Sequence, residues 1–133
     1  MKVMAFGTFD GVHPGHEYYL KKAKKYGELT VVVARDLTVK NVKGRFPKYN
    51  EQRRISDIKK LGIADNVVLG YLNNYYRVIE EIRPDILCFG YDQNSFTDDA
   101  RKKLRELGLL VEVVRIPSFK PDMYKSSKLN GSN

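Results

Sequence analysis

Short apolar runs and amphipathic helical patterns alternate along this chain from one end to the other. The β-branched run at 29–34 is typical of a buried strand, whereas residues 15–26 carry apolar side chains at helical spacing. The same criteria predict strands at 2–6, 29–34, 66–70, 85–90 and 109–116, and helices at 15–26, 50–60, 73 or 74 to 82, and 97–107. Because each strand except the last is followed by a helix, the order favours an α/β, Rossmann-like fold: a five-stranded parallel sheet with helices on both faces.

Local signals mark where these predicted helices begin and end. Asn50 and Thr97 are candidate N-caps, and Gly108 ends the last helix. The basic segment 36–49 contains a glycine and a proline, which predicts a loop. The 133 residues are expected to form a single domain, with a tail from about residue 117 that is rich in Lys, Ser and Asn.

Composition narrows the class of protein. The net charge of +8 favours a small phosphate-bearing ligand over nucleic acid, with lysine-rich solvated helix faces as the alternative. A single cysteine, Cys88, excludes an intrachain disulfide and suits a reducing cytoplasm. The sequence shows neither a signal peptide pattern nor an apolar run of membrane-spanning length. We therefore expect a cytoplasmic protein with no nucleic-acid or membrane partner.

The first predicted strand runs directly into a glycine-rich turn, Gly-Thr-Phe-Asp-Gly-Val-His-Pro-Gly-His, at 7–16. Gly7 and Gly11 allow the backbone to turn tightly and to approach a ligand. Pro14 suits the first position of a helix, where a missing N–H costs nothing. The amides of residues 15–17 are then predicted to be unpaired, and together with the helix dipole they would form an anion site.

Two histidines, the only two in the chain, flank this predicted anion site. His13 and His16 are three residues apart at a helix start and should lie on one face. They are interpreted as contacts to phosphate. As metal ligands they would lack a third donor apart from Asp10, and the remaining alternative is ordinary capping or surface histidines.

The segment His13-Pro14-Gly15-His16 resembles the His-x-Gly-His motif of the cytidylyltransferase-like nucleotidyltransferases, and the preceding Gly-Thr-Phe-Asp makes the resemblance specific. The resemblance extends to about residue 129 and is strongest to the archaeal-type FAD synthases, which are FMN adenylyltransferases. Further points of similarity lie at 33–36, 43–45, 51–53, 83–85, 90–93 and 125–128.

The resemblance implies in-line attack of an acceptor phosphate on the α-phosphorus of a nucleoside triphosphate, with release of pyrophosphate and no covalent enzyme intermediate. The catalytic residues would be His13 and His16, which would bind the triphosphate and its developing charge. The predicted nucleotide contacts are His13 and His16 together with Thr8, Phe9, Pro14, Gly15, Gly90, Asp92, Tyr124, Ser126, Ser127 and Lys128. Mg²⁺ would be carried mainly by the phosphates and water, with Asp10 as the candidate protein ligand.

For several of these predicted contacts, a purely structural role is the alternative. Asp92 is predicted to read the base or ribose but would equally cap its own loop, and the segment 125–128 would otherwise be a basic tail. The acceptor phosphate is predicted to be held by Lys43, Arg45 and Arg53. The alternative is that these side chains are solvent-exposed residues of a loop and a helix without a binding role.

The choice of substrates rests on the overall resemblance, which favours ATP and FMN. The alternative is CTP with glycerol 3-phosphate or a related phosphorylated acceptor. The glycerol phosphate enzymes usually carry a tryptophan where this chain has Gln93, and this chain contains no tryptophan. A different class, a non-catalytic nucleotide or RNA binder, fits less well because the whole histidine motif is present. Relatives of this short form are often homodimers, and the resemblance implies the same here.

Overall fold

The computed structural model describes residues 1–72, 75–90 and 98–117. Its elements in chain order are β1 (Lys2–Gly7), α1 (Pro14–Lys24), β2 (Glu28–Val33), α2 (Asp36–Lys43), α3 (Glu51–Lys60), β3 (Asn66–Leu69), α4 (Tyr75–Ile82), β4 (Ile86–Gly90), α5 (Asp98–Glu106) and β5 (Glu112–Ile116). The predicted alternation of strands and helices is confirmed, and α2 is an addition to it. No helix within these described ranges has the length and apolar character needed to cross a membrane.

The five strands form one parallel sheet in the order β3-β2-β1-β4-β5. The chain builds outward from β1 to β2 and β3, then returns to place β4 and β5 on the other side of β1. The strand order therefore reverses between β1 and β4, and in open α/β sheets ligands bind outside the carboxyl ends of strands at such a switch point.

At this switch point the side chain of Tyr19 takes the place of direct pairing between β1 and β4. The parallel register between β1 and β4 ends with Ala5 opposite Cys88. Beyond it, the buried Tyr19 hydroxyl donates to the Cys88 carbonyl oxygen at 2.8 Å and lies 3.1 Å from the Phe6 carbonyl oxygen. A side chain from α1 thus bridges the two strands where their own pairing stops.

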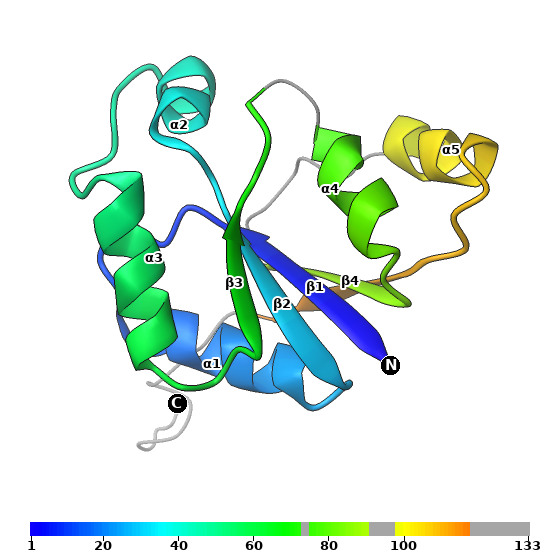
Figure 1. The fold of residues 1–133 in the computed structure, drawn as a ribbon, viewed down its shortest axis with the longest axis horizontal. Helices are drawn as coiled ribbons and strands as arrows, with labels where there is room; N and C mark the ends of the chain where they lie inside the picture. Colours follow the sequence, from blue (N-terminus) through cyan, green and yellow to red (C-terminus); the bar gives the residue numbers. More distant parts are fainter. Residues whose placement is uncertain (73–74, 91–97, 118–133) are drawn as a thin grey trace, which may run out of the picture.

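Helices cover both faces of the sheet, as predicted. Figure 1 shows α1 and α3 on one side of the strands and α4 and α5 on the other, with α2 beyond the carboxyl ends. β1 alternates accordingly, since Val3 and Ala5 pack in the core under α1 and α3, whereas Met4 and Phe6 pack under α4 and α5. A strand buried on both faces explains why its sequence is apolar without a break.

The prediction of a loop at 36–49 is wrong for its first half, which forms α2. Val39 is buried, acidic Asp36 lies in the first turn, and Lys40 and Lys43 lie in the last, an arrangement that complements the helix dipole. Gly44 adopts a left-handed conformation, φ 81°, and ends the helix. The glycine that suggested a loop is in fact the C-cap of a short helix.

Candidate active site

The histidine turn lies at the carboxyl end of β1. Phe9 turns inward with a positive φ of 56°, and its side chain is buried against Tyr19 and His16. A Cβ at Gly7 would lie 2.6 Å from the Phe9 ring, so this position requires a glycine. Phe9 therefore fixes the turn from below, and the motif is built on the hydrophobic core.

His13 and His16 cap the first turn of α1 for each other. The Gly15 amide donates to His13 Nδ1 at 3.0 Å, and the His13 amide donates to His16 Nδ1 at 3.3 Å. The two imidazole rings are stacked with centroids 3.8 Å apart. This is a capping box in which both side chains are histidines.

The mutual cap decides which nitrogen of each ring is the donor. A neutral imidazole that accepts at Nδ1 carries its proton on Nε2, so the hydrogen-bond pattern assigns the Nε2–H tautomer to both His13 and His16. The pair thus presents hydrogen-bond donors, as contacts to phosphate oxygens require.

The prediction that the first amides of α1 are unpaired is wrong. Besides the Gly15 amide, the His16 amide donates to the His13 carbonyl oxygen at 2.9 Å and the Glu17 amide donates to it at 3.3 Å. Because the histidine cap satisfies these groups within the turn, the donors that this structure offers are the imidazoles rather than a row of bare amides.

Gly15 is required by the same packing. A Cβ at this position would lie 2.8 Å from Cε1 and 3.0 Å from Nδ1 of the His13 ring. A side chain at the third residue of the motif would therefore displace the capping imidazole of His13.

Arg54, which the sequence analysis missed, joins the loops around the site. Its side chain is fully buried. Nη1 donates to the carbonyl oxygens of Thr8 at 2.8 Å and Ala34 at 2.7 Å. Nε donates to the Tyr49 carbonyl oxygen at 2.9 Å, and Nη2 pairs with Asp36 at 2.7 Å. One side chain thereby connects the loops that follow β1 and β2 to the segment before α3.

A helical signal for Arg54 was present in the sequence. It lies four residues before Ile58, and residues with this spacing share a helix face. Placing Ile58 against the sheet therefore places Arg54 against it as well, and both are buried in α3. The neighbouring Arg53 is 57% exposed and lies outside this buried face, and its predicted contact to the acceptor phosphate stays a prediction.

Asp10 fastens the histidine turn to the loop before α3. Its carboxylate accepts the amides of Lys48 at 2.7 Å and Tyr49 at 2.8 Å. Burial acts to raise the pKa of Asp10, but these amides and the positive charges of Arg54 and Lys43 outweigh it, and the pKa is lowered. Asp10 is ionised and already engaged with the backbone, which gives it a structural role alongside the candidate one toward metal.

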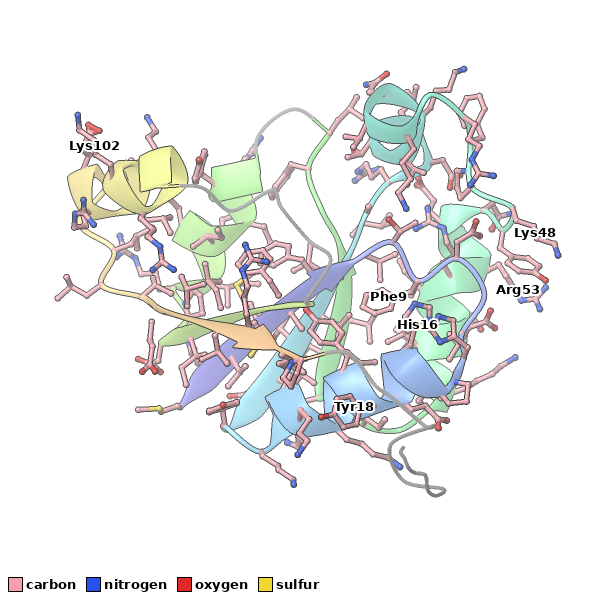
Figure 2. The ribbon with its side chains drawn as sticks, turned by 180° about the vertical axis from the view of Figure 1, so that it is seen from behind. Phe9, His16, Tyr18, Lys48, Arg53 and Lys102 are labelled. Carbon is pink, nitrogen blue, oxygen red and sulfur yellow. The ribbon has the colours of Figure 1, made fainter. Side chains whose placement is uncertain are left out.

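The predicted acceptor-phosphate residues lie on this same flank. Lys43 is close enough to Asp10 to lower its pKa, whereas Arg45 is exposed in the loop after α2. Arg53 pairs with Asp57 at 3.1 Å and covers the Tyr49 ring at 4.7 Å. Figure 2 shows Lys48 and Arg53 on the side of the molecule where Phe9 and His16 meet, with Lys102 at the opposite end.

Comparison with known proteins identifies this architecture. A family model described as cytidylyltransferase-like matches residues 4–130. The chain belongs to the cytidylyltransferase-like family.

Named proteins resemble this chain along nearly all of its length. The FAD synthase of Methanoculleus marisnigri is 45% identical over 97% of this chain and 86% of that protein. The FAD synthase of Thermoplasma volcanium is 39% identical over 97% of this chain and 91% of that protein. Among solved structures, the lipopolysaccharide core biosynthesis protein from Thermoplasma volcanium superposes with a TM-score of 0.84 at 41% identity, over 90% of this chain and 98% of that chain.

The remaining predicted residues of this cytidylyltransferase-like site divide into two groups. Gly90 ends β4 on the other side of the switch point from β2. The predicted contacts that lie outside the described residues are Asp92, Tyr124, Ser126, Ser127 and Lys128, together with the helix cap Thr97. Within the described ranges, no group of three His, Cys, Asp or Glu side chains is arranged to hold a metal ion.

Proposed function

We propose that this chain is an FMN adenylyltransferase, which transfers AMP from ATP to FMN and forms FAD and pyrophosphate. The mutual cap of His13 and His16 carries the proposal, because it sets two imidazole donors side by side at the carboxyl end of β1. The identity of the substrates is supported by the relatives named FAD synthase, which are 38–45% identical to this chain.

The reaction is a direct displacement at phosphorus. An oxygen of the FMN phosphate attacks the α-phosphorus of ATP and forms the new P–O bond. The bond from the α-phosphorus to the bridging oxygen breaks, and pyrophosphate departs with the electron pair. The attacking phosphate is already anionic near neutral pH, so catalysis consists of positioning and charge stabilisation and needs no strong general base.

The two histidines stabilise the charge that develops on the phosphates. In the Nε2–H tautomer each ring donates one hydrogen bond to a phosphate oxygen, and stacking and capping fix both rings before substrate binds. A donor that needs no reorganisation during the reaction stabilises the transition state most effectively.

A divalent cation, Mg²⁺ in this proposal, would supply further positive charge to the triphosphate when bound. The described residues support a cation held mainly by phosphate oxygens and water, because both Asp10 oxygens already accept backbone amides. We further propose that Lys43, Arg45 and Arg53 attract the acceptor phosphate, and that Thr8, Phe9, Pro14, Gly15, Gly90, Asp92, Tyr124, Ser126, Ser127 and Lys128 contact the nucleotide. A cytoplasmic location fits the unpaired, buried Cys88.

The experiment pairs two nucleotides with two acceptors. Purified protein with Mg²⁺ is incubated with ATP or CTP, each with FMN or glycerol 3-phosphate, and pyrophosphate release is followed while products are separated by chromatography. FAD formed from ATP and FMN alone is the expected result. A CDP-linked product would assign the chain to the cytidylyl branch, and no release from any pairing would refute both assignments.

A further inference from the structure

A pocket, here called the side pocket, lies near the ends of β2 and β3. It has a volume of about 410 Å³ and is lined by Arg35, Asp36, Leu37, Glu51, Tyr71 and Leu72. These residues follow β2, open α3 or follow β3, so the pocket lies at the carboxyl edge of the sheet, on the side of β1 away from β4.

The side pocket presents apolar surface to solvent. Leu37 is 49% exposed and Leu72 is 39% exposed, although both are large apolar side chains at the ligand-binding edge of the sheet. Tyr71 contributes an aromatic wall to the same pocket. The lining thus combines two leucines and a tyrosine with three charged side chains. Apolar and aromatic surface beside a small number of polar groups is usual in a site for a flat organic ligand.

The aromatic wall is held in place before any ligand arrives. The Tyr71 hydroxyl donates to Glu81 at 2.7 Å, and the Arg77 guanidinium lies over the Tyr71 ring at 4.4 Å from its centroid. Fixing a side chain in advance reduces the entropy lost on binding.

The polar rim of the pocket is fixed as well. Arg35 Nε donates to the Gly70 carbonyl oxygen at 2.8 Å, and its guanidinium is 3.7 Å from Glu51. Glu51 in turn accepts the Asp36 amide at 2.8 Å. Arg35 nevertheless stays 41% exposed, so its guanidinium can donate to carbonyl oxygens at the edge of a bound ring.

Arg54 connects the side pocket rigidly to the histidine turn. It binds Asp36 of the pocket at 2.7 Å and the Thr8 carbonyl oxygen of the turn at 2.8 Å. Neighbouring strands are spaced about 4.8 Å apart, so a pocket at the ends of β2 and β3 lies roughly 5 to 10 Å to the side of β1. A ligand in the pocket can therefore extend a short chain to the histidines.

We propose that the side pocket binds the tricyclic isoalloxazine ring of the acceptor, with Leu37, Tyr71 and Leu72 against the ring and Arg35 at its polar edge. This inference rests on the proposed function, because it assigns the place of the FMN ring in that reaction. FMN joins a flat ring to a phosphate through a five-carbon chain, which matches a pocket set to one side of the reacting centre. Glycerol 3-phosphate has no group that would occupy it.

The test replaces both exposed leucines and measures ring binding separately from catalysis. The variant carries Leu37→Ser with Leu72→Ser, and the matched control is Leu110→Ser, a leucine that is 90% exposed outside the pocket. Riboflavin, which has the ring and the chain but no phosphate, is the binding probe in equilibrium dialysis without ATP. FAD formation gives KM for FMN and for ATP.

In the double variant, the affinity for riboflavin should fall about tenfold and KM for FMN should rise about tenfold. A tenfold change corresponds to the free energy of burying part of one leucine side chain. KM for ATP, and every constant of the Leu110→Ser control, should stay within twofold of wild type. Equal riboflavin affinity in wild type and the double variant, or no saturable riboflavin binding by wild type, overturns the pocket assignment even if FAD is formed. A wild-type protein that binds riboflavin through the pocket but forms no FAD supports the pocket and refutes the transfer reaction.

Discussion

At the scale of single residues, His13 and His16 combine structural and chemical roles in one motif. Nδ1 of each imidazole accepts a hydrogen bond from a backbone amide at the start of the helix, and the ring proton is therefore on Nε2. Folding of the first turn of α1 therefore also fixes the donors of the active site. The two roles are carried by different nitrogens, so they can be separated by mutation.

His13→Asn separates them. Asparagine is one of the strongest N-cap residues, and its side-chain oxygen replaces Nδ1, so the melting temperature should stay near that of wild type. It has no counterpart of Nε2, and kcat for FAD formation should fall by about a hundredfold, as for loss of one preorganised donor. Thermal unfolding and initial rates on the same sample measure the two effects.

His13→Ala serves as the comparison for this variant. It should lose a similar amount of activity and in addition about 1 kcal/mol of stability, because the cap is gone. Turnover near that of wild type in His13→Asn would show that His13 acts through the cap alone and would refute its catalytic role.

At the scale of elements, α3 supplies the connection that holds the site together. Its N-terminus is capped by Asn50, whose side chain accepts the Arg53 amide at 2.8 Å, as the sequence predicted. One turn in, Arg54 donates to three backbone carbonyls from three different loops and pairs with Asp36. One side chain of this helix thus links the histidine turn to the loop that follows β2, in addition to the pairing of β1 with β2.

Replacing Arg54 by Met should cost about 3 kcal/mol, since it leaves buried carbonyl oxygens unpaired and Asp36 without its partner. The adjacent Arg53→Met is the matched control. Arg53 is 57% exposed and pairs within its own helix, so its loss should cost less than about 0.5 kcal/mol. Urea unfolding of both variants measures the difference, and equal losses would contradict the role assigned to Arg54.

The helices and strands were predicted well from the sequence where a single local pattern, such as an apolar run or a glycine cap, determined them. The mainly apolar runs of β1, β2 and β4 reflect burial on both faces, and Gly108, with φ 75°, follows α5 as expected. α2 was missed because it is only 8 residues long and buries only Val39, beside a glycine and a proline that suggest a loop. Its ends are set by Gly44 and by contacts with α3, which a local pattern does not contain.

The site was less predictable, because its geometry depends on side chains that meet across elements. The histidine motif identified the turn, but whether the amides of α1 were paired depended on which way two imidazoles fold. The side pocket brings Leu37 together with Leu72 from a different loop, and neither position stands out along the chain. Contacts of this kind follow from the strand order rather than from spacing in the sequence.

At the scale of the whole molecule, a surface carboxylate at the opposite edge of the sheet joins three segments. Asp65, just before β3, accepts Lys24 Nζ of α1 at 2.6 Å and the Leu29 amide of β2 at 2.8 Å. These hydrogen bonds, with Lys24 the larger contributor, lower the pKa of Asp65. A carboxyl whose pKa is lower in the folded state stabilises the fold above its unfolded pKa, and this contribution is lost as pH falls through the folded pKa.

Asp65→Asn should therefore flatten the acid side of the stability curve. Between about pH 4, near the unfolded pKa of an aspartate, and pH 2.5, wild type should lose melting temperature more steeply than Asp65→Asn. Lys24→Met should flatten the curve in the same direction because it removes the main cause of the shift. Parallel curves for wild type and Asp65→Asn would contradict a contribution from Asp65.

Cys88 reports on global unfolding. It lies in the centre of β4, fully buried, and burial raises the pKa of its thiol to about 11. At pH 8 both the low thiolate fraction and the lack of access should keep it unreactive toward a disulfide reagent, whereas unfolded protein should react within minutes. Rapid labelling of the native protein would show that the sheet opens at β4 far more readily than its packing indicates.

The contacts of Arg54 also affect how a sequence with this fold can change during evolution. The segment from Asp36 to Tyr49 begins and ends at the guanidinium of Arg54, which donates hydrogen bonds to both of these residues. A stretch of chain tethered at a shared anchor can gain, lose or exchange residues while the turn that bears His13 and His16 keeps its place. In a lineage built on this plan, the preference for an acceptor and the chemistry of transfer are free to evolve separately.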